Sequence, residues 1–226
     1  MEYRQIDEIL FAMEQAVSAK PSRINDVDRM AQAIRKEFPD LKVKSANGAS
    51  KECLVFPMLG YVLKWTVNTR EAERELAVYN EATKAGLSPF FPDTFRAGVL
   101  TFPNDDDIVV VAQQIVPMTA SRLSWDADYG LSAKLRRIAK TVPDVRSAQM
   151  ERQFRKADLN GYGRNLDTLW ARVAVSLYGK RRCIALCEFV KKFHINDLHG
   201  SNIGYIGTKP VLLDFSGFCV RDDFEF

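Results

Sequence analysis

Two short polar segments in the last part of the chain place the strongest constraint on its fold. Residues 195–202 read Ile-Asn-Asp-Leu-His-Gly-Ser-Asn, and Asp214 follows Asn202 by twelve positions, inside Leu-Asp-Phe-Ser-Gly (213–217). Apolar residues flank both segments, so the polar side chains project from a backbone that we expect to be buried. Loops of this kind often hold catalytic or binding residues. A carboxylate such as Asp197 can orient or take a hydroxyl proton, while an amide and a second carboxylate supply oxygen ligands for a metal ion.

These two segments resemble motifs of the protein-kinase superfamily. Residues 197–199 (Asp-Leu-His) with Asn202 are similar to its catalytic loop, and residues 214–216 (Asp-Phe-Ser) are similar to its metal-binding DFG triplet. The resemblance implies a Mg·ATP site in which Asp197 orients the acceptor hydroxyl, while Asn202 and Asp214 hold Mg²⁺.

The segments also depart from the usual kinase motifs. Ile195 stands where eukaryotic protein kinases carry the histidine of HRD, His199 replaces a lysine, and Ser216 replaces the glycine of DFG. We expect His199 to replace that lysine in stabilising the transferred phosphoryl group. A DLHxxN loop is commoner in aminoglycoside- and choline-kinase-like enzymes, and in small kinases of bacteriophages and bacterial effectors.

Upstream, a predicted sheet supplies a lysine. Residues 41–46, 53–58 and 61–65 read as three strands joined by tight turns. Period-two alternation puts Val62 and Lys64 on one face of the third strand. This strand resembles the VAIK strand of kinases, whose lysine grips the α/β-phosphates of ATP. An edge-strand lysine that discourages aggregation is the alternative, and the downstream motifs favour the ATP interpretation.

A helix is predicted over residues 69–85, with apolar residues at three- and four-residue steps and Gly86 as its C-cap. The resemblance implies that a glutamate of this helix pairs with the strand lysine. Glu75 is our choice because it lies closest to the apolar stripe, and Glu71 and Glu73 stay open. A solvated helix charge is the alternative for each of them.

The sequence matches only part of the glycine-rich loop that covers the phosphates in kinases. Kinases use three glycines there so that backbone N–H groups approach the phosphates, whereas residues 47–51 (Asn-Gly-Ala-Ser-Lys) contain one. Gly48 permits a positive φ, and Ser50 or Lys51 offers a donor. A plain hairpin turn explains these residues about as well, so we expect a reduced lid.

The hinge between the lobes is expected after a buried strand. Residues 108–112 form a continuous apolar run, preceded by a turn at 104–107. The resemblance then implies that residues 113–117 receive adenine through their backbone groups, with Ile115 or Val116 as the contact.

The chain is predicted to be an α+β protein with a bilobal protein kinase-like fold. Residues 1–40 form an N-terminal extension of two helices, residues 41–116 a small antiparallel-sheet N-lobe, and residues 117–226 a shortened helical C-lobe with the catalytic and metal-binding loops. Because the sequence ends twelve residues after Asp214, we expect a minimal kinase without an activation segment, and therefore constitutive activity.

Composition excludes several classes of protein. The 226 residues are 46% hydrophobic with a net charge of +3, as expected of a globular chain with one or two lobes. No run approaches the roughly 20 apolar residues of a membrane span, and the first residues carry no secretory signal. We therefore expect a cytoplasmic protein with no membrane partner. Cys183 and Cys187, one helical turn apart, read as free thiols in the core.

Residues 119–193 lack strand patterning, read as helices and are basic. Solvated helix faces account for each basic cluster taken alone, and together the clusters allow an acidic protein substrate or an RNA-bound target. A nucleic-acid-binding motif and interleaved aromatic residues are missing, so we predict no nucleic-acid binder. The three clusters are Lys134, Arg136, Arg137 and Lys140; Arg152, Arg155 and Lys156; and Lys180, Arg181 and Arg182.

The sequence thus predicts a phosphotransferase that uses ATP and Mg²⁺, most concretely a minimal Ser/Thr protein kinase of phage or effector type. A small-molecule phosphotransferase of the aminoglycoside- or choline-kinase kind is one alternative. A nucleotide-binding pseudokinase is a second, although the strand lysine and the three motif residues are retained. Nucleotidyl transfer (AMPylation) with ATP bound in a flipped pose is a third.

Overall fold

The structure is a computed structural model, and it describes residues 3–18, 27–47, 51–66, 68–101, 107–125, 129–142, 149, 152, 168–195 and 198–215. The chain divides into two compact units. The first comprises Met1–Ala77 and Asp93–Ile115, and the second comprises Val78–Pro92 and Val116–Phe226. The predicted extension at 1–40 falls in the same unit as the sheet, and Val78–Pro92 falls with the C-terminal part of the chain.

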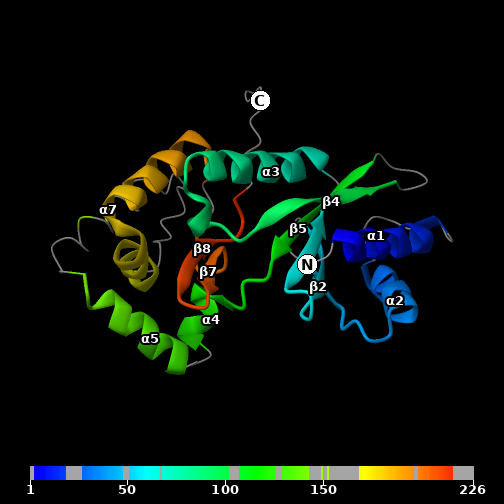
Figure 1. Cartoon of the computed structure of the whole chain (residues 1–226), viewed down its shortest axis with the longest axis horizontal. Coiled ribbons are helices and arrows are strands. Elements are labelled where there is room, and N and C mark those ends of the chain that lie inside the picture. The colour runs from blue at the N-terminus through cyan, green and yellow to red at the C-terminus, as the bar shows by residue number, and fades with distance from the viewer. Residues whose placement is uncertain are drawn as a thin grey trace. The chain divides into compact units, whose positions relative to one another are not determined.

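The first unit is built on a five-stranded antiparallel sheet (Figure 1). Its strands are β1 (Lys44–Asn47), β2 (Glu52–Phe56), β3 (Tyr61–Trp65), β4 (Thr94–Leu100) and β5 (Ile108–Gln114), in the order β1-β2-β3-β5-β4. The three predicted strands at 41–46, 53–58 and 61–65 correspond to β1, β2 and β3. The expected α+β class is confirmed, with an antiparallel sheet in the N-terminal part.

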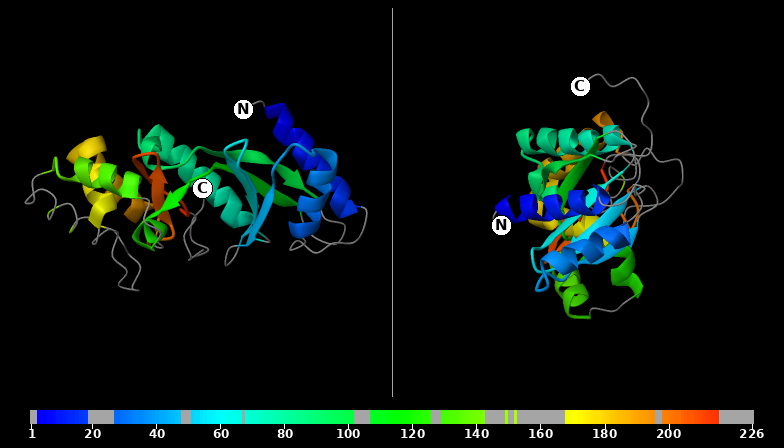
Figure 2. Two further views of the ribbon diagram at one scale, coloured as in Figure 1. Left: turned by 90° about the horizontal axis from the view of Figure 1, so that it is seen from below. Right: turned by 90° about the vertical axis from the view of Figure 1, so that its right-hand side faces the viewer.

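Two helices cover one face of this sheet (Figures 1 and 2). Both α1 (Tyr3–Ser18) and α2 (Val27–Glu37) share a hydrophobic core with the inward side chains of the strands. Alternation along the strands selects these side chains, because successive residues point to opposite faces. From the sheet the core receives Leu54, Phe56, Leu63, Trp65, Leu100, Ile108, Val110 and Ala112.

The N-terminal half of α3 (Thr69–Lys84) packs on the opposite face. Ala72 and Leu76 lie one turn apart on this helix and contact Val109 and Val111 of β5. The helix ends at Lys84, one residue before the predicted end, and Gly86 follows it with a φ of +70°. Glycine adopts this conformation without steric cost, so it suits a helix C-terminus.

The second unit is mainly helical in its described part (Figure 1). A three-stranded antiparallel sheet in the order β6-β7-β8 accompanies the helices. The elements are the end of α3, the 3-10 turn η1 (Ser88–Phe90), β6 (Met118–Thr119), α4 (Ala120–Trp125), α5 (Tyr129–Ala139), α7 (Thr168–Lys192), β7 (Ile203–Ile206) and β8 (Lys209–Leu212).

The core of the second unit surrounds Trp170, which is fully buried on α7. Its indole N–H is within hydrogen-bond distance of Gly204 O on β7 (3.2 Å) and of Val211 O on β8 (3.3 Å). Cys183 and Cys187 are buried free thiols in this core, as predicted. Helix α7 is interrupted at Gly179, whose φ of 78° and ψ of 156° are not helical.

Among the helices of the described ranges, none combines the length and apolar character that crossing a membrane requires.

Candidate functional site

Lys64 and Glu75 form a buried ion pair inside the first unit. Lys64 is the fourth residue of β3 and lies on the face that α3 covers, while Glu75 lies on α3 between Ala72 and Leu76, which contact the sheet. The Lys64 Nζ contacts Glu75 Oε1, and their side chains are 9% and 1% exposed. Removing two charges from water costs several kcal/mol per ion, so a pair this deep requires close partners. The glutamate chosen from the sequence is thus the one that contacts the strand lysine.

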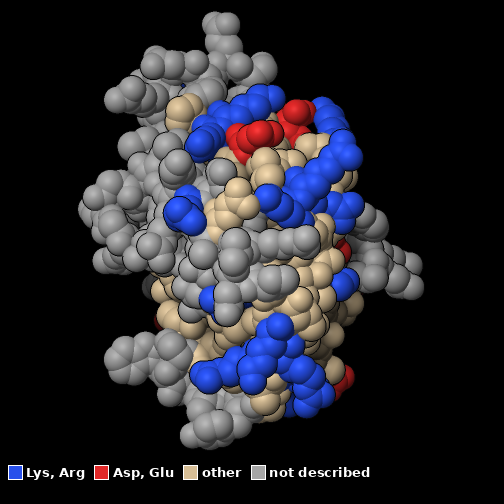
Figure 3. Space-filling view, turned by 90° about the vertical axis from the view of Figure 1, so that its left-hand side faces the viewer, with Lys and Arg blue, Asp and Glu red and all other residues tan. Residues whose placement is uncertain are grey.

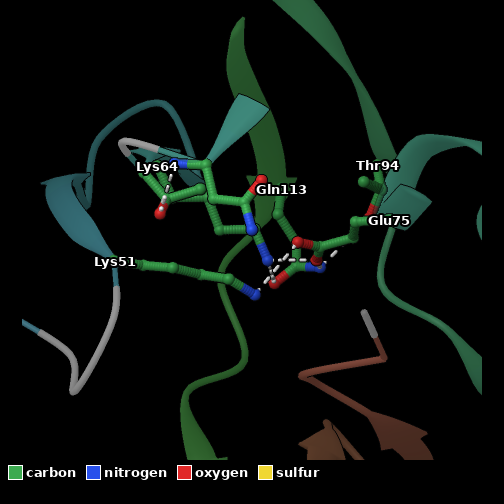
Figure 4. A network of polar contacts seen from close by, with 7 residues as sticks. Lys51, Lys64, Glu75, Thr94 and Gln113 are labelled. Carbon is green, nitrogen blue, oxygen red and sulfur yellow. Dashed lines mark hydrogen bonds and ion pairs between the residues drawn. The ribbon is translucent and has the colours of Figure 1, made fainter. Parts of the chain in front are cut away.

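Gln113 of β5 completes this network (Figure 4). Its side-chain oxygen accepts a hydrogen bond from Lys64 at 3.1 Å, and its Nε2 donates to Glu75 Oε1 at 3.1 Å and to Thr94 Oγ1 at 3.2 Å. Both ends of the amide are therefore used, which fixes its orientation. Three strands and α3 thereby hold the Lys64 ammonium group in one position.

The sequence interpretation placed Gln113 in the hinge at 113–117, whereas β5 extends through Gln114 and includes it, although one signal of a buried role was present. Gln113 follows the buried run of β5 and is itself buried. A buried polar side chain needs hydrogen-bond partners. Gln113 is paired with Val62 across β3 and β5, so period-two alternation places it on the face of Lys64. Ala112, one residue earlier, belongs to the core under α1 and α2.

Lys51 is a second lysine at the Glu75 carboxylate. Its Nζ lies 3.4 Å from Glu75 Oε2, and its side chain is 11% exposed. The residue immediately precedes β2. Figure 4 shows the Lys51 side chain extending toward Glu75 from the β2 side. One buried carboxylate therefore contacts two ammonium groups, one at each of its oxygens.

Cys53 lies beside this network because it is paired with Lys64 across β2 and β3. Burial raises the pKa of the Cys53 thiol, while the charges of Lys64 and Lys51 act in the opposite direction. The raised pKa keeps the thiol protonated, and a protonated thiol is a poor nucleophile. Cys53 is thus suited to packing rather than to covalent chemistry at this position.

The second unit brings Asn202 and Asp214 to one end of the β7–β8 hairpin. Ile203 is paired with Leu212, so the residues just outside this pair adjoin one another. The Leu213 N–H donates to Asn202 O at 2.8 Å. Asp214 comes next, and both it and Asn202 are half-buried. The hairpin therefore brings the backbones of Asn202 and Asp214 near each other.

Backbone contacts on either side hold these two residues. The Asn202 N–H donates to His199 O at 2.8 Å, and the Ser201 N–H donates to His199 Nδ1 at 3.1 Å. A His199 Nδ1 that accepts a hydrogen bond carries no proton, so a proton on this ring is at Nε2. Phe215, directly after Asp214, is fully buried and its ring lies 5.0 Å from that of Phe91.

The other predicted site residues belong to the expected lid, catalytic loop and hinge. Asp197, Gly48 and Ser50 lie outside the described residues. The Ile115 N–H donates to Gly60 O at 2.8 Å, so a contact from Ile115 to a base would use its carbonyl or its side chain. Val116 belongs to the second unit.

In the part of the chain that the structure describes, no three His, Cys, Asp or Glu side chains are grouped as a metal site. Asn202 and Asp214 are one amide and one carboxylate, so the pair would hold a cation only with ligands from elsewhere. Magnesium accepts such an arrangement, because it commonly takes one or two protein carboxylates and fills its coordination with water and substrate phosphates.

Comparison with protein-family models, with curated proteins and with solved structures found no match for the chain.

Proposed function

We propose that this chain is a phosphotransferase that uses ATP and Mg²⁺, most concretely a minimal protein kinase that phosphorylates serine or threonine. The observation that carries the proposal is the buried Lys64–Glu75 pair. It lies between an antiparallel sheet and a helix, and it joins the two residues that the resemblance to kinases selects. A bilobal kinase-like arrangement of the two units is part of the proposal.

The pair suits a lysine that must stay charged and fixed. Glu75 and Gln113 hold the Lys64 ammonium at a set position, and an ammonium held ready does not have to be reoriented when a phosphate arrives. In the proposed enzyme, Lys64 contacts the α/β-phosphates and Glu75 positions Lys64.

Asn202 and Asp214 are the residues that would hold Mg²⁺, because both offer hard oxygen ligands at one hairpin end. Bound there, the ion would neutralise charge on the phosphates. Asp197 would orient the acceptor hydroxyl. His199, whose ring is held through Nδ1, would direct Nε2 toward the transferred group. Most of the catalytic effect would come from positioning and charge compensation.

A basic surface on the second unit supports a protein substrate with acidic character (Figure 3). Exposed basic residues gather on α5 and α7, with one exposed acidic residue, Glu188, among the described residues of these two helices. Such a surface attracts acidic partners and raises their association rate. Its basic members are Lys134, Arg136, Arg137, Lys180, Arg181, Arg182, Lys191 and Lys192.

The test is intact-mass spectrometry after incubation with Mg·ATP and a cytoplasmic lysate, the compartment in which we place the activity. The unmodified chain is compared with Asp197→Ala, Lys64→Met and Lys44→Gln, the last an exposed lysine of β1 as control. We expect transfer of a phosphoryl group to the chain or to a lysate protein. Loss of the proposed base should slow it by about 10²- to 10⁴-fold, and Lys44→Gln should leave it unchanged.

Each other outcome has a defined meaning. Transfer of AMP instead of a phosphoryl group would replace kinase activity with nucleotidyl transfer. Consumption of ATP only with an added amino alcohol would make the acceptor a small molecule. Nucleotide binding without any transfer, in the presence of all these acceptors, would leave a pseudokinase. A folded chain that binds no nucleotide would refute the proposal as a whole.

A further inference from the structure

Lys51 occupies an unusual position for a lysine directly before a strand. A lysine immediately before a strand ordinarily extends into water, because burial of an ammonium group is unfavourable. Here the side chain is 11% exposed and its Nζ is 3.4 Å from Glu75 Oε2. Glu75 is itself 1% exposed. Lys51 is therefore drawn inward to the carboxylate that already contacts Lys64.

The strand explains how Lys51 reaches this carboxylate. Leu54 and Phe56 of β2 point into the core under α1 and α2. The residues that alternate with them, 51, 53 and 55, therefore point to the face that α3 covers. Cys53 confirms this orientation, because it is paired with Lys64 in the next strand. Lys51 lies one alternation step farther along the same face.

The two lysines are held differently. Lys64 lies within a central strand and contacts both Glu75 Oε1 and Gln113 Oε1. Lys51 lies before its strand and contacts the other oxygen of Glu75 at a longer distance. An anion added next to Lys51 Nζ would therefore compete with Glu75 Oε2, whereas the Lys64–Glu75–Gln113 contacts use other atoms.

We propose that Lys51 is a second phosphate-binding lysine, which turns from Glu75 Oε2 to the di- or triphosphate of a bound nucleotide. Because it takes a nucleotide as ligand, this role rests on the proposed function. An ammonium group at the start of β2 supplies the donor that a glycine-rich loop supplies through backbone N–H groups. The sequence before β2 offers a single glycine, at Gly48, for that purpose. Glu75 thus positions one lysine permanently and keeps the other near the phosphates.

The experiment is a calorimetric titration of the full chain with adenosine, ADP and ATP. The variants are Lys51→Gln, Lys51→Arg and the control Lys44→Gln. A lost charge-assisted hydrogen bond corresponds to about 10- to 100-fold in affinity. Lys51→Gln should therefore lower the affinity for ADP and for ATP by this factor and leave the affinity for adenosine unchanged. Lys51→Arg should retain most of the affinity, and Lys44→Gln should match the unmodified chain.

A second measurement needs no substitution. Lysine acetylation followed by peptide mass spectrometry should show Lys51 reacting more slowly with ADP bound than with adenosine bound at equal saturation, while Lys44 reacts equally in both. Equal protection with both ligands would overturn the proposal, even if Lys51→Gln failed to fold.

The failures are distinguishable. If the unmodified chain binds ATP and Lys51→Gln binds it as tightly, Lys51 is only a structural partner of Glu75 and the proposed function stands. An equal loss for adenosine and ATP would mean that Lys51 shapes the pocket, which also overturns the inference. If the folded, unmodified chain binds neither ADP nor ATP, the role of Lys51 and the proposed function fail together.

Discussion

The side-chain amide of Gln113 donates to the same Glu75 oxygen that contacts Lys64. Gln113 also accepts a hydrogen bond from Lys64, so Lys64, Glu75 and Gln113 each contact the other two, and all three side chains are buried. The pairwise contacts of such a network support one another, and each lost member leaves the others with unsatisfied groups. Substitutions in this network are therefore expected to lower the stability of the first unit.

Glu75→Ala should strongly destabilise the first unit. The substitution leaves the Lys64 ammonium buried without its carboxylate, and breaking a buried pair in this way costs about 3–5 kcal/mol. Urea unfolding followed by tryptophan fluorescence measures the loss. Glu81→Ala on the same helix removes the exposed partner of Lys84 and should cause no measurable change.

The double substitution Lys64→Met with Glu75→Leu tests the cause of that loss. If the cost of Glu75→Ala arises from the unpaired Lys64 charge, the double variant should recover part of that loss, while Lys51 and the Gln113 amide still lack Glu75. A double variant as unstable as Glu75→Ala would mean that α3 depends on Glu75 for packing instead.

Gln113→Leu should lower both stability and nucleotide affinity. It removes a donor and an acceptor from buried partners, which costs about 1–3 kcal/mol in the free energy of unfolding. The Lys64 ammonium also loses one of the groups that fix it, so ATP should bind more weakly. The matched control is Gln114→Leu, at the half-buried end of the same strand. Equal effects of the two substitutions on ATP affinity would contradict a positioning role for Gln113.

The two core cysteines should make the second unit sensitive to alkaline pH. Burial raises the pKa of Cys183 and of Cys187 from 9.0 to about 12. The folded state therefore keeps both thiols protonated where the unfolded chain ionises them. Their contribution to stability is complete below pH 9 and is lost as the pH rises toward 12. The free energy of unfolding, measured between pH 8 and pH 11, should fall less steeply in Cys183→Ala/Cys187→Ala. Parallel slopes would show that other groups dominate the decline.

Gly179→Ala should destabilise α7 through its backbone alone. A Cβ at this position meets no atom within 4 Å, but the φ of 78° and ψ of 156° lie in a region that is essentially restricted to glycine. We expect a loss of about 1–3 kcal/mol in thermal or urea unfolding. Gly207→Asn, in the β7–β8 turn with a φ of 60°, should cost less because asparagine tolerates the left-handed region.

Several elements could be predicted from the sequence because their signals are local. Strands β2 and β3 are joined by a tight turn at 57–60, and α3 has a helical apolar period that is followed by Gly86. The choice of Glu75 over Glu71 and Glu73 depended only on its position relative to that period. These features need no knowledge of distant partners.

Other features depend on partners far away in the sequence. Strand β4 is at the edge of the sheet, and its pairing with β5 shifts between Arg96 and Gly98. Such a bulge breaks the alternation that identifies a strand. The role of Gln113 in the network depends on the pairing of β5 with β3. The break in α7 at Gly179 depends on backbone angles that cannot be predicted from a single glycine in the sequence. The kinase roles themselves remain predictions, since Asp197 is outside the described residues.

Trp170 determines more than the packing of its own helix. Gly204 and Val211, whose carbonyls lie within reach of its indole N–H, are direct partners across β7 and β8. A slip of the hairpin by one residue would move one of these carbonyls away and turn every side chain of that strand to the opposite face. The indole N–H of Trp170 on α7 therefore favours one register of the β7–β8 hairpin. In this register Asn202 lies beside Leu213, the residue before Asp214.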